Sequence, residues 1–430
     1  MFIYTVKPGD TLTSVASSNG ISVDALAADN GLDGSARLAL GQALIVNPPI
    51  ITHIVTEGET LSFIAAQYGT TESQLLYENP AIVDADSIVP GQVIYISGRQ
   101  VRLGNISVNG YVYDYVNLDV LRQTLPYLTW VTVFGYGLRT DGSLVYPNDS
   151  EIIAAALSAG VAPVMLLTAM TDDGRFSSEN ASYILNNLDV QQTLINNIYE
   201  VAVSKGYYAV DSDFEYVPSE DRQAYADFIM RLRQRLNPSG IEVFVALAPK
   251  VSDDQRGLLY ESHDYGLLGN AADQVLLMTY EWGYAYSQPM AVAPINSVRR
   301  VLEYGLTRID ASKILMGIPN YGYDWNVPTV ENQRARTISN SEAIELAVRY
   351  GAEILFDEES QTPHFNYVDE SGQGHDVWFE DARSLNAKLR LVAGESLNGI
   401  GVWNVMNFFQ PLWTLTVNLF NIRKIVDREV

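Results

Sequence analysis

Cysteine is absent from this chain of 430 residues, which excludes disulfide bonds and any chemistry that depends on a thiolate. Histidine is scarce as well. The four that occur, His53, His263, His364 and His375, stand far apart in the sequence, without the short spacing that metal ligands show. We therefore predict no zinc or other metal site and no Ser-His-Asp triad.

Basic residues are few: 27 Lys and Arg stand against 51 Asp and Glu, which gives a formal net charge of −24 at pH 7. This charge argues against nucleic acid as a partner, because a phosphate backbone binds basic surfaces. No apolar run approaches the roughly 18 residues that a membrane-spanning helix needs, so we predict no membrane span. Residues 1–6 carry no basic region, apolar core or cleavage site, so we do not expect a signal peptide.

A repeat occupies the first hundred residues. Residues 4–12 (YTVKPGDTL) return as residues 53–61 (HIVTEGETL), and residues 41–45 (GQALI) return as residues 91–95 (GQVIY) after a one-residue insertion. Each copy contains a short strand, a turn, two helices and a closing strand that pairs with the first. We therefore predict two β-α-α-β modules, at residues 1–48 and 51–97, with a linker at Asn47-Pro48-Pro49.

Both copies resemble the LysM domain, a small module that binds glycans containing N-acetylglucosamine, such as peptidoglycan and chitin. The V-x-x-G-[DE]-T-L signature and a late asparagine carry the resemblance in each copy. It implies a glycan-binding groove in each copy, formed in the first by Gly9, Asp10, Thr11, Leu12 and Asn30 and in the second by Gly58, Glu59, Thr60, Leu61 and Asn79. The alternative is structural, since the glycines also suit a turn and the leucines a core.

From about residue 100 onward, short apolar runs alternate with amphipathic helical stretches. The strand candidates are residues 107–113, 130–136, 162–169, 207–215, 242–249, 274–280, 313–320 and 398–404. Eight βα units predict an α/β fold, a (β/α)8 TIM barrel over residues 101–430. A doubly wound sheet is the alternative, but no Gly-rich phosphate loop follows any strand. The long interval after the seventh strand predicts an α+β insertion at about 326–378 that forms a wall of the cleft.

Three carboxylates occupy alternate positions of the fourth strand candidate: Asp211, Asp213 and Glu215. Alternate side chains of a strand share a face, so we predict that all three point the same way, about 7 Å apart. Such a row is unfavourable for folding, but it suits a site that keeps a carboxylic acid protonated near neutral pH. The alternative is a solvated edge strand, and the apolar neighbours Val210 and Phe214 argue against it.

Aromatic side chains gather at the carboxyl ends of the predicted strands, where the active site of a TIM barrel lies. Such rings suit the apolar C–H faces of sugars, although aromatic residues at strand ends are also ordinary core residues. The candidates for substrate binding are Tyr111, Phe134, Tyr136, Met278, Trp282, Tyr321, Trp325 and Trp403.

The acidic row resembles the D-x-x-D-x-D-x-E motif of the family-18 glycoside hydrolases, the chitinase family. Met278-Thr279-Tyr280 and Trp403 match further positions of that family, and the resemblance covers roughly residues 100–430. Two departures stand out: Tyr208 and Ala209 replace the first acid and the glycine of the motif, and the third strand lacks the usual serine-glycine-glycine. We expect these departures to lie at buried support positions.

The resemblance implies a retaining mechanism in which the N-acetyl oxygen of the substrate attacks the anomeric carbon. Glu215 would be the general acid and then the base, Asp213 would orient the acetamido N–H, and Asp211 would hold or share its proton. Tyr280 would hydrogen-bond the acetamido oxygen, and Trp403 would be the floor under the sugar. No metal or organic cofactor is implied.

Two LysM-like modules, the lack of a signal peptide and the YYAVDSDFE segment at residues 207–215 together resemble the spore cortex fragment-lytic enzymes of spore-forming bacilli. Those are N-acetylglucosaminidases that act on cortex peptidoglycan during germination. The resemblance implies a location at the spore cortex, the coat region or the cell wall. A chitinase or muramidase with the same mechanism, or a catalytically weak chitinase-like lectin, is the alternative. The sequence makes no prediction of oligomeric state.

Overall fold

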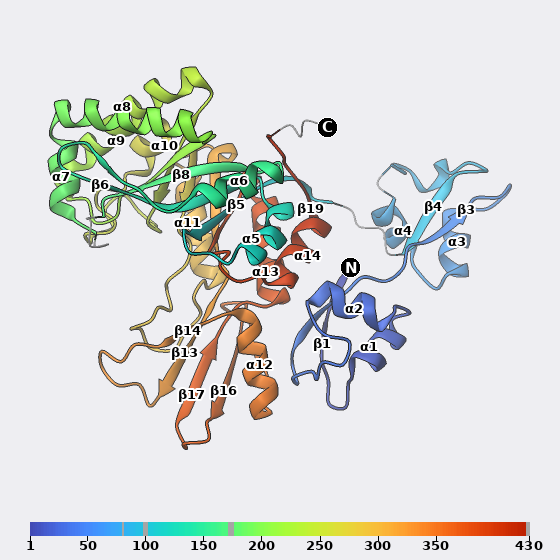
Figure 1. Ribbon diagram of the computed structural model, residues 1–430. Coiled ribbons are helices and arrows are strands. Elements are labelled where there is room, and N and C mark those ends of the chain that lie inside the picture. The colour runs from blue at the N-terminus through green and yellow to red at the C-terminus, as the bar shows by residue number, and fades with distance from the viewer. Residues whose placement is uncertain (80, 98–101, 171–175, 427–430) are drawn as a thin grey trace.

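The computed structural model describes residues 1–79, 81–97, 102–170 and 176–426 (Figure 1). Its first part consists of two small modules with the predicted β-α-α-β order. Module 1 contains β1 (Phe2–Thr5), α1 (Leu12–Ser18), α2 (Val23–Asn30) and β2 (Ala43–Val46). Module 2 contains β3 (Ile51–Ile54), α3 (Leu61–Gln67), α4 (Glu72–Glu78), a 3-10 turn (Ala85–Ser87) and β4 (Val93–Ser97). In each module the two strands pair antiparallel.

The predicted barrel is confirmed. Eight parallel strands form a closed sheet, because β5 pairs with both β18 and β6. In order around the barrel they are β5 (Gly104–Tyr113), β6 (Trp130–Leu138), β8 (Ala162–Thr168), β9 (Ala209–Asp213), β10 (Glu242–Leu247), β11 (Gln274–Leu277), β12 (Ile314–Pro319) and β18 (Gly399–Trp403). Two short strands pair with the ends of barrel strands: β7 (Leu144–Val145) with the end of β6, and β19 (Phe420–Ile422) with the start of β5.

Helices lie between the strands of the barrel and cover it from outside (Figure 1). They are α5 (Leu118–Thr124), α6 (Ser150–Ser158), α7 (Ser178–Leu185), α8 (Leu188–Lys205), α9 (Arg222–Leu236), α10 (Tyr265–Ala271), α11 (Ile295–Gly305), α13 (Ala382–Gly394) and α14 (Gln410–Leu419). In α11 the buried Val298, Val301 and Leu302 recur at spacings of three and four, the pattern of a helix with one apolar face. No helix in the described part of the chain is long and apolar enough to cross a membrane.

The insertion follows the seventh barrel strand, as predicted, and it is an antiparallel sheet with one helix. The sheet contains β13 (Gly322–Val327), β14 (Arg336–Ile338), β15 (Leu355–Asp357), β16 (Thr362–Val368) and β17 (Gly374–Trp378), and the helix is α12 (Asn340–Tyr350). Its first strand begins at Gly322, a few residues before the expected start.

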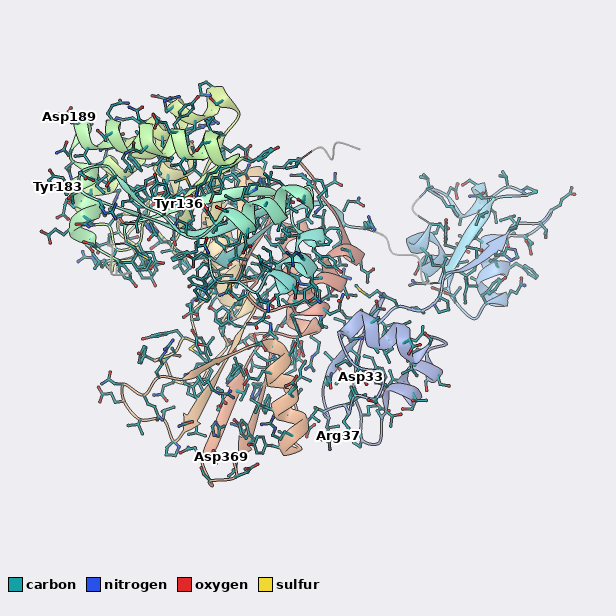
Figure 2. The ribbon with its side chains drawn as sticks, viewed as in Figure 1. Asp33, Arg37, Tyr136, Tyr183, Asp189 and Asp369 are labelled. Atoms are coloured by element: carbon teal, nitrogen blue, oxygen red, sulfur yellow. The ribbon has the colours of Figure 1, made fainter. Side chains whose placement is uncertain are left out.

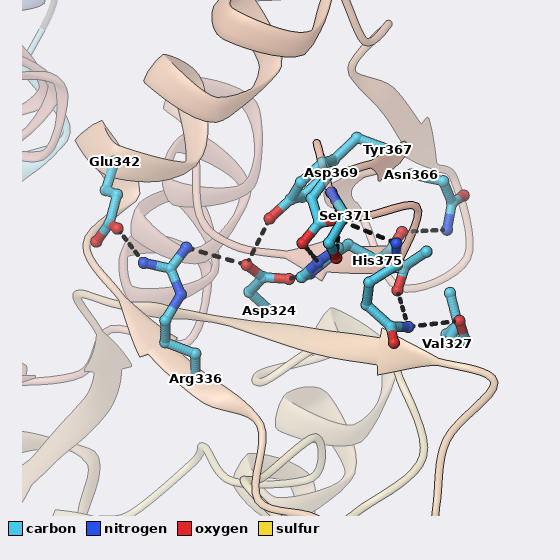
Figure 3. A network of polar contacts seen from close by, with 11 residues as sticks. Asp324, Val327, Arg336, Glu342, Asn366, Tyr367, Asp369, Ser371 and His375 are labelled. Carbon is cyan, nitrogen blue, oxygen red and sulfur yellow. Dashed lines mark hydrogen bonds and ion pairs between the residues drawn. The ribbon is translucent and has the colours of Figure 1, made fainter.

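A buried carboxylate, Asp324, lies inside the insertion (Figure 3). It accepts hydrogen bonds from the hydroxyl of Tyr367 at 2.9 Å and from Nη2 of Arg336 at 3.0 Å, and Nδ1 of His375 lies 2.7 Å from it. Burial of a charge is unfavourable unless the charge is paired and hydrogen-bonded, as it is here. The network ties β13 to β14, β16 and β17.

The two modules differ in their relation to the rest of the chain. Module 1 lies beside α12 and α14, and Ala43 and Ile45 of its strand β2 belong to the same hydrophobic core as the barrel (Figure 1). Module 2 stands farther out and has a core of its own, formed by residues between Val55 and Ile96.

Candidate active site

Strand β9 carries the three acids toward the barrel interior. Asp211 and Asp213 lie in β9, and Glu215 follows two residues after its end. The alternate side chains point outward: the ring of Phe214 stacks on Tyr225 of α9 at a centroid distance of 5.5 Å. This outward packing is the physical reason that the acids face inward together.

Burial raises the pKa values of all three acids, and repulsion from nearby carboxylates adds to the rise for Asp213 and Glu215. Burial raises the pKa of Asp211 to about 7, although a 2.8 Å hydrogen bond from the Tyr111 hydroxyl opposes the rise. Burial, followed by the charges of Glu215 and Asp211, raises the pKa of Asp213 well above its ordinary value. Burial raises the pKa of Glu215 to about 7. Proton donors near neutral pH are therefore available at this point of the barrel.

A fourth carboxylate, Glu281, stands beside this group. Its charge adds to the rise in the pKa of Glu215. It directly follows Tyr280 and accepts hydrogen bonds from the hydroxyls of Tyr321 and Tyr323, the latter at 3.0 Å. The sequence places Glu281 at the predicted barrel mouth, between Tyr280 and Trp282, but we assigned it no individual chemical role.

Trp403 ends β18 and lies among three other rings. The centroids of Tyr111, Tyr113 and Phe134 are 5.8, 5.8 and 5.7 Å from it. It borders a groove of about 460 Å³ that Tyr321 and Tyr323 also line. A second cleft, of about 370 Å³, is lined by residues that include Tyr280, Glu281 and Trp282. Aromatic side chains thus surround Trp403, the carboxylate of Glu281 lines the second cleft, and the partly buried Met278 packs against the core cluster that contains Tyr111.

Tyr136 does not belong to the mouth, and this expectation was wrong. It is fully buried, its hydroxyl donates to Asp149, and Nζ of Lys205 lies 2.9 Å from the same hydroxyl. Figure 2 labels the position of Tyr136 in the barrel. The cause is an irregularity in β6: Val133 pairs with Met165 but Tyr136 pairs with Leu167, so β6 contains one extra residue. One extra residue turns every later side chain to the opposite face of the sheet.

Two further expectations need correction. Trp325 is buried and borders a different cavity, with Tyr284 and Tyr286, so the structure does not bring it to the groove of Trp403. Tyr208 precedes β9 and is 37% exposed, so it is no buried support residue, whereas Ala209 is buried as expected.

His263 holds the end of β9, and the sequence analysis missed it. The ring is fully buried; Nδ1 accepts a hydrogen bond from the Ala248 amide at 2.8 Å, and Nε2 lies 3.0 Å from the carbonyl oxygen of Phe214. Nε2 is therefore the protonated nitrogen and donates to that carbonyl. Burial lowers the pKa of His263 to about 4, which keeps this tautomer neutral. The residue so fixed directly precedes Glu215.

In the modules, the predicted glycan-binding residues also stabilise the fold. Gly9 and Gly58 have positive φ in their turns, Thr11 and Thr60 cap helices, and Leu12 and Leu61 are buried. Asp10 accepts from the Lys7 amide, and Glu59 from the Thr56 amide. The side-chain amides of Asn30 and Asn79 donate to a carbonyl oxygen of α2 and of α4, respectively. Each also pairs with the N–H and the C=O of one residue in the closing strand, Ile45 and Tyr95 respectively. Glycan contact by these ten residues stays a prediction.

Known proteins resemble this chain over nearly its whole length. Residues 171–407 match the family described as Glycosyl hydrolases family 18, and residues 4–47 and 53–97 match the LysM domain. The cortical fragment-lytic enzyme of Bacillus anthracis is 36% identical, over 98% of this chain and 99% of that protein.

Solved structures agree with these matches. The spore cortex-lytic enzyme SleL of Bacillus megaterium superimposes with a TM-score of 0.86 at 36% identity, over 99% of both chains. A chitinase from Chromobacterium violaceum superimposes with a TM-score of 0.68 at 26% identity, over 73% of this chain and 98% of the chitinase. The chain therefore belongs to the glycosyl hydrolases of family 18 and is a glycoside hydrolase that carries two LysM domains ahead of its barrel.

Proposed function

We propose that this enzyme is an N-acetylglucosaminidase that cleaves β-1,4 bonds in peptidoglycan, and that its substrate in the cell is spore cortex fragments during germination. The observation that carries the proposal is the placement of Glu215, with a pKa of about 7, beside the buried Asp213 and Tyr280. The names of the relatives, cortical fragment-lytic enzyme and spore cortex-lytic enzyme, support the choice of substrate.

The mechanism we propose is retaining and substrate-assisted. Protonated Glu215 gives its proton to the leaving glycosidic oxygen while the acetamido oxygen of the substrate attacks the anomeric carbon. Asp213 accepts a hydrogen bond from the acetamido N–H, and the Tyr280 hydroxyl donates to the acetamido oxygen. Glu215, now ionised, removes a proton from the water that opens the oxazolinium intermediate. These steps require no metal or organic cofactor.

Asp211 lies two residues before Asp213 on β9, and we propose that it supports this chemistry. Buried oxygens of Asp211 and Asp213, one on each, have no hydrogen-bond partner among the described residues. A proton held between the two carboxyl groups would satisfy both, as in other pairs of buried acids. Trp403 is the proposed floor under the sugar, and Tyr111, Phe134, Met278, Trp282 and Tyr321 are further proposed contacts.

The LysM domains bind glycan, and we propose that they hold the enzyme on peptidoglycan at the spore cortex, the coat region or the cell wall. The proposed division is residues 1–48, 51–97 and 101–430, of which positions 101 and 430 lie outside the described residues. This division separates the part that binds the polymer from the part that cleaves it.

Mass spectrometry of digested cortex fragments tests the proposal. A glucosaminidase leaves N-acetylglucosamine at the new reducing end, and we expect this product from the wild-type enzyme. Muramic acid at the reducing end would identify a muramidase instead. Activity on chitin oligosaccharides, with none on cortex fragments, would identify a chitinase. The Glu215→Gln variant is the matched control, and full activity in it would exclude Glu215 as the acid.

A further inference from the structure

Module 1 is fixed to the barrel through α14. The hydroxyl of Thr414 donates a hydrogen bond to the carbonyl oxygen of Asp29 at 2.8 Å. Gly31, which follows α2 with φ of +63°, lies so close to α14 that a Cβ atom there would stand 2.7 Å from Cβ of Gln410. Real Cβ atoms do not approach that closely, so the two surfaces are packed without space for a side chain at this position.

The same module is also fixed to the insertion. The amide of Ile354, in the segment between α12 and β15, donates to the carbonyl oxygen of Leu40 at 2.9 Å. A Cβ atom on Gly41 would stand 2.0 Å from the carbonyl oxygen of Ile354. Ala39 is buried in the core of the insertion, together with Ile338 and other residues of that unit. Module 1 therefore bridges the barrel and the insertion.

Module 2 has the same turn but lacks this contact. Gly91 corresponds to Gly41 and has nearly the same φ, +85° against +77°, but no atom of the described residues lies within 4 Å of a Cβ atom placed there. Val89 corresponds to Ala39 and is 58% exposed, whereas Ala39 is 4% exposed. The repeat itself thus provides controls for the contacts of Ala39 and Gly41.

The insertion forms one wall of the groove that Trp403 borders. Ile338, which shares a core with Ala39, lines the groove of Trp403. The neighbouring Thr337 pairs with Tyr323 across the β13–β14 ladder, and the Tyr323 hydroxyl holds Glu281. A shift of the insertion would therefore move both the groove wall and the carboxylate that stands beside Glu215.

We propose that module 1 is a positioning element of the catalytic groove: it holds the insertion in place through residues 39–41, independently of any glycan that its own groove binds. The inference rests on the proposed function, since the groove must be the place of hydrolysis. It gives the two LysM domains different roles, because among the described residues module 1 shares core contacts with the barrel and the insertion, whereas module 2 has a core of its own.

The test compares Gly41→Ala with Gly91→Ala. Both substitutions put a Cβ atom on a turn residue with positive φ, but only the first drives a side chain into Ile354. Ala39→Val, which introduces the residue found at the equivalent position of module 2, is a milder second variant, with Val89→Ala as its control. Hydrolysis of a soluble peptidoglycan tetrasaccharide is followed across pH, because so short a substrate does not need the modules to hold it.

We expect Gly41→Ala to lower kcat/KM on the tetrasaccharide at least tenfold, with Gly91→Ala within twofold of the wild type. The basic limb of the pH–rate profile should move to lower pH in Gly41→Ala, because Glu281 then stands farther from the general acid. A folded Gly41→Ala enzyme with wild-type kcat/KM and pH profile would overturn the proposal. If circular dichroism shows that Gly41→Ala is unfolded, Ala39→Val is judged by the same two criteria. A wild-type enzyme that leaves the tetrasaccharide intact would instead contradict the proposed function.

Discussion

Replacement of Glu215 by glutamine should abolish most of the activity and, above neutral pH, stabilise the fold. Glutamine keeps the shape of the side chain but has no acidic proton to transfer and no charge. A positioned general acid contributes roughly 10²- to 10⁴-fold to a rate, so we expect kcat to fall by that factor. The same substitution removes a carboxylate that the fold disfavours in its ionised form.

The gain in stability follows from the pKa of Glu215, about 7 in the folded protein against an ordinary value of 4.5. A rise of about 2.5 units corresponds to roughly 3 kcal/mol. Because the pKa of Glu215 is higher in the folded than in the unfolded protein, the free energy of unfolding of the wild-type enzyme falls by this amount as the pH rises from about 4.5 to 7. The free energy of unfolding of the Glu215→Gln variant does not fall for this reason. The difference in unfolding free energy should therefore be near zero at pH 4 and up to about 3 kcal/mol at pH 8.

Tryptophan fluorescence during denaturation at several pH values measures this difference. All six tryptophans lie between residues 130 and 413, so the signal reports the barrel and the insertion and not the modules. Glu200→Gln, at an exposed position of α8, is the control and should change the unfolding free energy by less than about 0.5 kcal/mol. Equal stability of wild type and Glu215→Gln at pH 8 would refute the raised pKa, whatever the activity.

Three further substitutions probe the residues around the acids. Tyr111→Phe removes the hydrogen bond that favours the Asp211 carboxylate, so the pKa of Asp211 should rise by about one unit, measured as a shift in the pH–rate profile. His263→Phe leaves the Phe214 carbonyl and the Ala248 amide unpaired, which should cost roughly 2–5 kcal/mol in unfolding free energy and lower kcat more than it changes KM. Trp403→Ala should raise KM for soluble fragments about tenfold, and an unchanged KM would exclude Trp403 as the sugar platform.

Local patterns predicted most of the architecture. The repeat at residues 4–12 and 53–61, and the eight apolar runs, depend on side chains close together in the sequence. The inward direction of Asp211 and Asp213 follows from alternation along one strand. These features appear in the structure because tertiary contacts do not compete with them.

The wrong and missed predictions depend on contacts between segments that are far apart in the sequence, and residue spacing does not reveal such contacts. Tyr136 turns to the outer face because β6 contains one extra residue relative to β8, and such a bulge depends on the neighbouring strand. His263 lies 49 positions after Phe214, and only the fold brings its ring to that carbonyl. The different surroundings of Ala39 and Val89 were equally hidden, because the two copies read alike while their neighbours in space differ.

Module 1 packs against the barrel and the insertion and module 2 does not in the described part of the chain, and this difference decides which module can be replaced in an engineered enzyme. Residues 39–41 of module 1 are constrained by surfaces outside the module, so replacing it with a foreign wall-binding domain should damage the enzyme. In the part of the chain that the structure describes, Val89 and Gly91 of module 2 meet no such surface, so module 2 is the better place to exchange one binding specificity for another. Two copies of one domain in the same chain can thus tolerate different substitutions. The surfaces packed against module 1 restrict its residues, whereas the residues of module 2 are restricted mainly by the ligand it binds.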